Sequence, residues 1–157
     1  MKPRLNAYQA APPVMKAMMA LESQAAGIGL EPLLMELVKI RASQINGCAF
    51  CLHMHTRDAR TKGEKEERIY VLDAWRESPF YSARERAALA WTEAVTLVSQ
   101  THVPDDVYEQ ARAEFSEEEL VKLTLLVATI NAWNRFAISF RSIHPVNVKA
   151  GSTATAA

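Results

Sequence analysis

Two cysteines and a histidine are the side chains of this sequence best suited to chemistry. Cys48 and Cys51 form a CxxC, and His55 follows four residues after Cys51. On a helix that turns about 100° per residue these three share one face, whereas His53 lies about 160° away from His55. A nearby histidine can accept a thiol proton or stabilise a thiolate, and a second thiol can close a disulfide on the oxidised first one. The spacing therefore predicts redox chemistry at the cysteine pair.

The residues before the pair place both thiols at the start of a helix. Asn46-Gly47 is typical of a break between helices, so the next helix is expected from about Cys48 to Gly63. Unpaired amide N–H groups and the helix dipole in the first turn stabilise a negative charge. We therefore expect a thiolate to be favoured there.

Glu36 is a further candidate on the preceding helix, expected at about 31–44. It borders the apolar stripe of that helix, so its carboxylate is expected to be partly desolvated. Desolvation raises the pKa of a carboxyl group and suits it to proton transfer. A salt bridge with Lys39 or Arg135 is the alternative interpretation.

Zinc binding is an alternative for the same residues. Three ligands of a tetrahedral site are available in Cys48, Cys51 and His55. The fourth would have to be water, a carboxylate, His102 or His144, none of which stands at a spacing typical of zinc sites. A second alternative is a pair of buried, inert thiols.

The elements that position these residues are expected to be helices. Apolar residues recur at helical spacing nearly throughout, and no stretch alternates in the manner of a strand, so we expect an all-α fold. Ser82 and Ser116 each precede a glutamate by three residues, which is typical of a capping box. Helices are expected at about 12–27, 31–44, 48–63, 64–75, 82–98, 104–115 and 117–140.

The last of these helices, 117–140, is apolar nearly all round and is therefore expected to be central. Its apolar surface is interrupted by Asn131, Trp133, Asn134 and Arg135. Buried polar groups need partners, so a hydrogen-bond network or a subunit contact is favoured for these residues over catalysis.

Length and charge exclude several classes of protein. A chain of 157 residues fits one domain, expected over 1–145, with a flexible tail over 146–157. The 18 basic and 18 acidic side chains balance, which argues against a nucleic-acid partner. The N-terminus lacks a signal-peptide core, and the most apolar run, Leu123 to Asn134, is shorter than the roughly 20 residues that span a bilayer. We therefore expect a cytoplasmic protein with no membrane partner, in which a CxxC is redox-active or metal-binding.

The spacing of these residues resembles a known family. Glu36, eleven intervening residues, Cys48, Cys51 and His55 match E-x11-C-x2-C-x3-H. This is the signature of the alkylhydroperoxidase D (AhpD) branch of the carboxymuconolactone decarboxylase superfamily. The text RASQINGCAFCLHMHTRDARTKG and the later WRxSPF and RERAALAWTE are also typical of that branch, and the resemblance covers roughly residues 20–145.

The resemblance implies an all-helical protein that assembles as a homotrimer or homohexamer, with its sites near subunit interfaces. It implies peroxide reduction by the CxxC pair without a bound cofactor. Electrons would come from a dithiol of the lipoyl type or a lipoyl-carrying protein, and some members of the branch serve a peroxiredoxin partner.

The resemblance also implies a role for each site residue. Cys51 would be the peroxidatic cysteine that becomes a sulfenic acid, and Cys48 the more exposed thiol that supplies a proton and resolves the disulfide. His55 and Glu36, with or without a bridging water, would form the proton relay. Phe50 stands where the founding member has a second histidine, so a shorter relay is expected. Lactone decarboxylases of the superfamily typically lack this CxxC, which argues against that reaction, although catalysis on a small carbonyl or lactone substrate stays an alternative.

Overall fold

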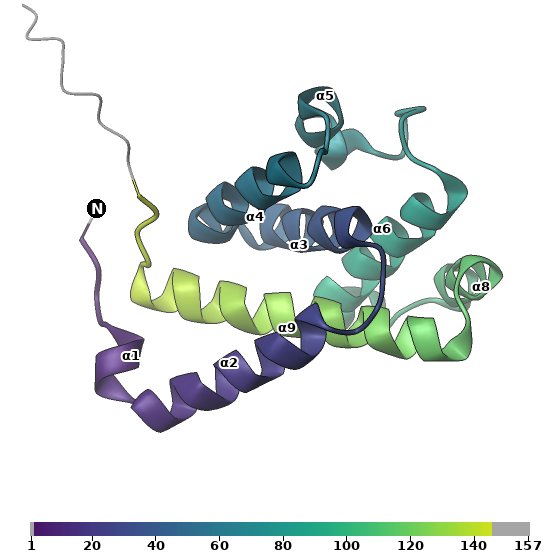
Figure 1. Ribbon diagram of the computed structural model, residues 1–157. Helices are drawn as coiled ribbons and strands as arrows, with labels where there is room; N and C mark the ends of the chain where they lie inside the picture. Colours follow the sequence, from purple (N-terminus) through teal and green to yellow (C-terminus); the bar gives the residue numbers. More distant parts are fainter. Residues whose placement is uncertain (1, 146–157) are drawn as a thin grey trace, which may run out of the picture.

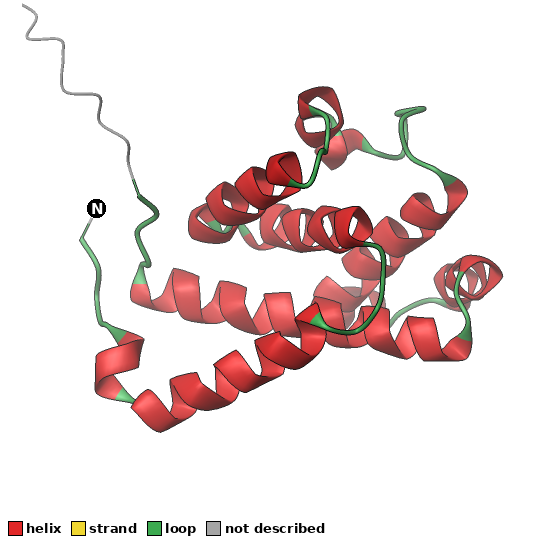
Figure 2. Cartoon of the chain, in the orientation of Figure 1, coloured by secondary structure: helices red, strands yellow, loops and turns green. Residues whose placement is uncertain are grey.

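The computed structural model describes residues 2–145, and within them every regular element is a helix (Figure 2). The predicted all-α class is confirmed. The flexible tail predicted for 146–157 lies outside the described residues. Among residues 2–145, no helix has both the length and the apolar character needed to cross a membrane.

The helices follow one another with short connections, and most of them match the predicted ranges. They are α1 (Ala7–Ala10), α2 (Pro12–Ala26), α3 (Pro32–Asn46), α4 (Ala49–Thr61), α5 (Glu66–Tyr70), the 3-10 turn η1 (Leu72–Ala74), α6 (Ala83–Thr96), α7 (Val98–Thr101), α8 (Asp105–Glu114) and α9 (Glu117–Phe140).

Both predicted capping boxes are present. The Ser82 and Ser116 Oγ atoms accept the N–H of Glu85 and Glu119, each at 3.2 Å. In return, each glutamate carboxylate accepts its serine N–H at 2.8 Å. These paired bonds satisfy donors that a helix start otherwise leaves free, which fixes where α6 and α9 begin.

The prediction of one helix over 64–75 is wrong, because this segment forms two elements, α5 at Glu66–Tyr70 and η1 at Leu72–Ala74. Ile69, Leu72 and Trp75 are all buried. In a 3-10 turn the side chains at i and i+3 lie directly above one another. The spacing of three therefore lets these residues face the core where the α-helix gives way to a 3-10 turn.

α3 and α9 form the centre of the fold. α3 packs against α4, α6 and α9, and α9 also packs against α2, α6 and α8. Figure 1 shows α2 along the side of α9 that faces away from α3 and α4. Leu37 and Val38 of α3 and Leu123 and Val127 of α9 are fully buried. The predicted central place of the last helix is therefore confirmed.

The N-terminal segment returns to the end of α9 (Figure 1). The Arg4 N–H donates to the Phe140 carbonyl, and Arg4 Nη1 donates to the Ser139 carbonyl, each at 3.0 Å. These bonds hold the start of the chain beside the C-terminal turn of α9. The N-terminal segment and the end of α9 then lie next to the cysteine helix and line a pocket together with it.

Candidate active site

The two thiols lie at the first turn of α4. Gly47 ends α3 with a left-handed backbone (φ 69°), a conformation that a side chain would strain. Cys48 is then the N-cap of α4, one residue before the helix, and its Sγ accepts the Cys51 N–H at 3.4 Å. The two Sγ atoms are 2.6 Å apart, so the thiols are placed to react with one another.

Both thiols are buried, with 1% of Cys48 and 2% of Cys51 exposed. The expectation that Cys48 is the more exposed thiol is therefore wrong. The N-cap conformation turns the Cys48 side chain back over the first turn of α4, where both cysteines pack against Ala42 and Ile130.

The thiol pair favours a negative charge on Cys48. The pKa of Cys48 is lowered to about 7. The largest cause is the hydrogen bond with the Cys51 thiol, and the Cys51 N–H and the Asn134 side chain act in the same direction, whereas burial opposes them. The same thiol hydrogen bond, burial and the charge on Cys48 raise the pKa of Cys51. The first proton therefore leaves Cys48, as expected for a thiol at a helix start, while Cys51 keeps its own.

His55 and Glu36 form a buried hydrogen-bonded pair on the same side of α4 as Cys51. His55 Nδ1 lies 2.9 Å from Glu36 Oε2, and the two side chains are 7% and 3% exposed. Lys62 donates to the other carboxylate oxygen, Oε1, and Lys39 Nζ lies 4.0 Å from it. With Nδ1–H directed at the carboxylate, His55 Nε2 is left to exchange a proton with another group.

The expected raised pKa of Glu36 is wrong. Burial does raise it and is the largest single effect, but the hydrogen bonds from His55 and Lys62 and the charges of His55 and Lys39 outweigh burial and lower the pKa to about 2. Glu36 therefore stays ionised at neutral pH. An ionised carboxylate in this position can orient His55 and stabilise a positive charge on it, whereas Glu36 is poorly suited to give up a proton itself.

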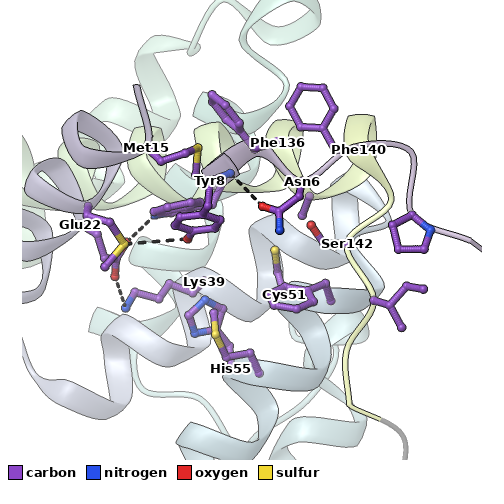
Figure 3. Close-up of a pocket in the computed structure, with 18 of the residues that line it drawn as sticks. Asn6, Tyr8, Met15, Glu22, Lys39, Cys51, His55, Phe136, Phe140 and Ser142 are labelled. Carbon is purple, nitrogen blue, oxygen red and sulfur yellow. Dashed lines mark hydrogen bonds and ion pairs between the residues drawn. The ribbon is translucent and has the colours of Figure 1, made fainter. Parts of the chain in front are cut away.

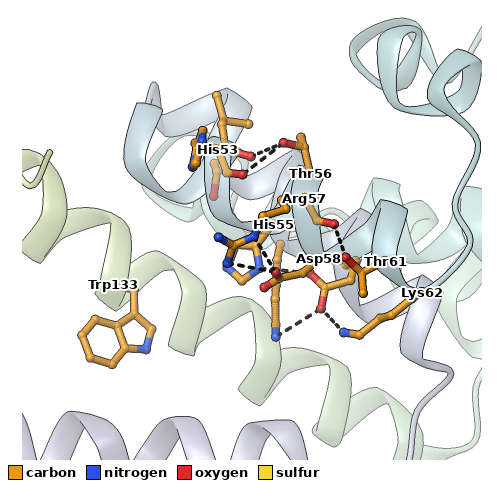
Figure 4. Close-up of polar contacts among 12 residues, drawn as sticks. His53, His55, Thr56, Arg57, Asp58, Thr61, Lys62 and Trp133 are labelled. Carbon is orange, nitrogen blue, oxygen red and sulfur yellow. Dashed lines mark hydrogen bonds and ion pairs between the residues drawn. The ribbon is translucent and has the colours of Figure 1, made fainter. Parts of the chain in front are cut away.

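Lys62 is a site residue that the sequence analysis did not single out. It stands seven residues after His55, which is about two helical turns and hence the same face of α4. Helical periodicity could have placed it on that face, although its pairing with a carboxylate of α3 depends on the packing of the two helices. Figure 4 shows His55 and Lys62 on one side of α4 and His53 on the other.

A buried amide network supports the thiols from behind. Asn46 Nδ2 donates to the side-chain oxygens of Asn131 at 2.9 Å and of Asn134 at 2.8 Å. Asn134 is completely buried, and its Nδ2 donates to Ser43 Oγ at 3.1 Å. The hydrogen-bond network predicted for the polar residues of α9 is confirmed, and one of its members, Asn134, lowers the pKa of Cys48.

Cys51, His55 and Glu36 line one pocket of about 770 Å³, which Figure 3 shows between α2, α4 and the end of α9. Its polar rim includes Glu22, which accepts the Trp133 Nε1–H at 2.9 Å and lies 3.7 Å from Lys39 Nζ. The walls are largely apolar and include Tyr8, Met15, Met54, Phe136 and Phe140.

The predicted zinc ligands are not assembled in this structure. Among the described residues, the His, Cys, Asp and Glu side chains whose ligand atoms lie within 4.8 Å of one another are Glu36, His55 and Asp58, a group without a cysteine. Two of these three are already joined to each other, and Lys62 neutralises the carboxylate. This arrangement favours proton chemistry over a zinc site built on Cys48 and Cys51.

The other histidines lie away from the thiols. His53 stacks on His144, with ring centroids 4.5 Å apart. His102 ends α7 in a left-handed backbone conformation. The structure thus places His55, and not His53, in the same pocket as Cys51, as the helical spacing predicted.

Comparison with known proteins places the chain in a family. The model of the carboxymuconolactone decarboxylase family matches residues 12–94. The uncharacterised protein YdfG of Bacillus subtilis is 47% identical over 139 residues, which are 88% of this chain and 95% of YdfG. This chain belongs to the carboxymuconolactone decarboxylase family.

Two solved structures bear on the branch and the fold. ATU0492 of Agrobacterium tumefaciens, a protein of unknown function suggested to be the antioxidant defence protein AhpD, is 50% identical with a TM-score of 0.91; the match covers 92% of this chain and 99% of ATU0492. It supports the AhpD-like branch expected from the motif. The debrominase Bmp8 is 19% identical with a TM-score of 0.77, over 88% of this chain and 74% of Bmp8, and shows the fold alone.

Proposed function

We propose that this protein is a thiol-dependent peroxidase that reduces hydrogen peroxide or organic hydroperoxides through Cys48 and Cys51. The observation that carries the proposal is the pair of buried sulfurs 2.6 Å apart, one of which lines the same pocket as the hydrogen-bonded His55–Glu36 pair. A dithiol and a proton donor are the groups that a two-electron reduction of a peroxide requires.

The first step transfers one peroxide oxygen to Cys51. The Cys51 sulfur attacks that oxygen while its proton passes to the Cys48 thiolate, and the O–O bond breaks. The leaving alkoxide takes a proton from His55, whose positive charge Glu36 stabilises. Cys51 becomes a sulfenic acid and an alcohol is released.

The second step closes the disulfide. The Cys48 sulfur attacks Cys51 Sγ, and the departing hydroxyl takes the proton from Cys48 and leaves as water. Two thiols and one hydroperoxide thus become one disulfide, one alcohol and one water. A dithiol of the lipoyl type, free or on a protein, then reduces the disulfide, and a peroxiredoxin is a further partner of the same chemistry.

The resemblance supports the remaining parts of the proposal, namely a cytoplasmic homotrimer or homohexamer without a bound cofactor. The N-terminal helices are consistent with an interface, because Leu5, Tyr8, Val14 and Met19 are each about half exposed, at 47–56%. Apolar groups gathered in this way on a surface are typical of protein contacts.

The test is turnover of hydrogen peroxide and cumene hydroperoxide with dihydrolipoamide as electron donor. We expect Cys51→Ser to lower turnover at least about a hundredfold, because the nucleophile is lost. Cys48→Ser should still form a Cys51 sulfenic acid, trapped by dimedone, but should not turn over. Full activity of Cys51→Ser would refute the proposal.

Catalysis on a small carbonyl or lactone compound is the second candidate. It is favoured by the His55–Glu36 pair, which is complete without the thiols and could move a proton on a bound substrate. Removing both cysteines with Cys48→Ala and Cys51→Ala separates the two candidates. Activity that survives this change would belong to the carbonyl reaction.

A further inference from the structure

The two cysteines line different pockets. Cys51 lines the large pocket with His55, whereas Cys48 lines a second pocket of about 330 Å³ that includes Arg4 and Arg141. Neither cysteine lines the pocket of the other.

The wall between the pockets is formed by side chains that line both of them: Phe50, Ala137 and Ser142. The bond that joins the two sulfurs in the oxidised protein would therefore connect two separate spaces.

The two pockets differ in charge. The large pocket contains the carboxylates of Glu22, Glu36 and Asp58, which offset its two lysines. The Cys48 pocket contains two arginines, and none of the described residues lining it is acidic. An anion is therefore attracted to the Cys48 pocket and not to the Cys51 pocket.

Both arginines are held at the end of α9. Arg4 Nη1 donates to the Ser139 carbonyl at 3.0 Å. Arg141 follows the helix in a left-handed backbone conformation (φ 54°). Within residues 2–145 neither guanidinium forms an ion pair, so both positive charges are available to a ligand.

We infer that the electron donor is an anionic dithiol that enters through the Cys48 pocket, while the peroxide reaches Cys51 through the other one. The inference rests on the proposed function. Thiol–disulfide exchange requires attack in line with the S–S bond, so this donor has to reach Cys48 Sγ from the side away from Cys51.

The exchange balances in two steps. A donor thiolate forms a bond to Cys48 Sγ, the protein S–S bond breaks, and its electron pair leaves on Cys51 Sγ, which takes a proton. The second donor thiolate then attacks the donor sulfur of this mixed disulfide and releases Cys48. The donor becomes a cyclic disulfide, and its two protons and two electrons are on the protein thiols.

The experiment compares dihydrolipoate with its neutral amide, dihydrolipoamide, which differ in one negative charge. The Cys48–Cys51 disulfide is made with diamide instead of peroxide, and its reduction is followed in a single turnover by counting protein thiols. We expect dihydrolipoate to react about three- to tenfold faster at low ionic strength, with the preference fading as salt is added.

Arginine variants identify the pocket. Arg141→Gln and Arg4→Gln should each reduce the preference for dihydrolipoate, and the double variant should abolish it. Arg4→Lys, which keeps the charge, should retain most of it. Arg57→Gln changes an exposed residue of the cysteine helix α4 that does not line the Cys48 pocket. It removes one positive charge and should leave the preference intact.

The outcomes separate this inference from the proposed function. Equal rates with the two dithiols, or a preference that survives in the double variant, would overturn the anionic donor site. The opposite combination is also informative. If the charge preference depends on the two arginines but the reduced protein does not react with peroxides, the peroxidase proposal is refuted and the anionic donor site is supported.

Discussion

At the residue scale, the site depends on how protons are shared between close neighbours. Glu36 is ionised although it is buried, because His55 and Lys62 both contact its carboxylate. A negative charge on the thiol pair is favoured at Cys48, because the Cys51 sulfur lies 2.6 Å away and the Cys51 N–H donates to the Cys48 sulfur, and both lower the pKa of Cys48. The identity of these residues suggested proton transfer, but their contacts decide which group holds each proton.

Glu36→Gln tests the ionised carboxylate through protein stability. Its pKa falls from 4.5 to about 2 on folding, so ionised Glu36 stabilises the native state above pH 4.5, and this contribution is lost as the pH falls through about 2. The shift corresponds to about 3 kcal/mol at neutral pH. We expect wild type and Glu36→Gln to differ most in urea unfolding at neutral pH and to converge below pH 4.5.

The control for this comparison is Glu109→Gln, a change on the exposed face of α8. It should alter the free energy of unfolding by less than about 0.5 kcal/mol at any pH. A stability difference for Glu36→Gln that did not vary with pH would show that the carboxylate is not held ionised by its partners.

At the element scale, α9 does most to position the site. Its capping box fixes where it begins, its apolar stripe packs against α3, and its last three turns carry the polar side chains toward the thiols. The end of α9 also holds the N-terminal segment through Arg4. A helix that was only apolar would bury the same area but would leave Asn46 and Ser43 without their partners on α9.

Asn134→Leu tests this role of α9. It removes the acceptor of one Asn46 hydrogen bond and the donor to Ser43, so we expect the free energy of unfolding to fall by about 1–3 kcal/mol. It also removes a side-chain amide that lowers the pKa of Cys48, so this pKa should rise above about 7. The pH dependence of alkylation by iodoacetamide measures this pKa.

Asn131→Leu is the matched control, since Asn131 lies one turn earlier and is also buried and bonded to Asn46. It should destabilise the protein to a similar extent and leave the alkylation profile unchanged. If both variants shifted the profile equally, Asn134 would act on the thiols only through general loosening of the fold.

At the scale of the whole molecule, the large pocket is assembled from parts that are distant in the sequence. The N-terminal segment with α1 and α2, the cysteine helix α4 and the end of α9 each supply a wall (Figure 3). A volume of about 770 Å³ is far more than hydrogen peroxide occupies and is in the range of sites for organic ligands. For the proposed peroxidase, a pocket of this size and apolar lining predicts a preference for bulky apolar hydroperoxides.

Phe136→Ala tests this preference. The aromatic ring lines the pocket, and its removal takes away roughly 1 kcal/mol of apolar contact with a bulky substrate. We expect KM for cumene hydroperoxide to rise about fivefold, while the rate with hydrogen peroxide changes less than about twofold. Phe80→Ala, on a residue that is 43% exposed outside the pocket, should change neither rate. Equal losses with both peroxides for Phe136→Ala would argue against substrate contact.

The sequence by itself determined the features that depend on local spacing. Helical periodicity and capping residues predicted the all-α class and the bounds of α9, and the helical offset of Cys51 and His55 predicted that they share one face of α4. The polar network of α9 was also predictable, since buried amides need partners.

Only the tertiary structure decided the features that depend on distances between helices. The expected pKa of Glu36 was wrong because Lys62, 26 residues away, reaches its carboxylate once α3 and α4 pack together. The expectation that Cys48 is more exposed than Cys51 was wrong because other helices cover both thiols. Their separate pockets arise for the same reason, because solvent access and charge at a buried group are set by whatever packs around it and not by its neighbours in sequence.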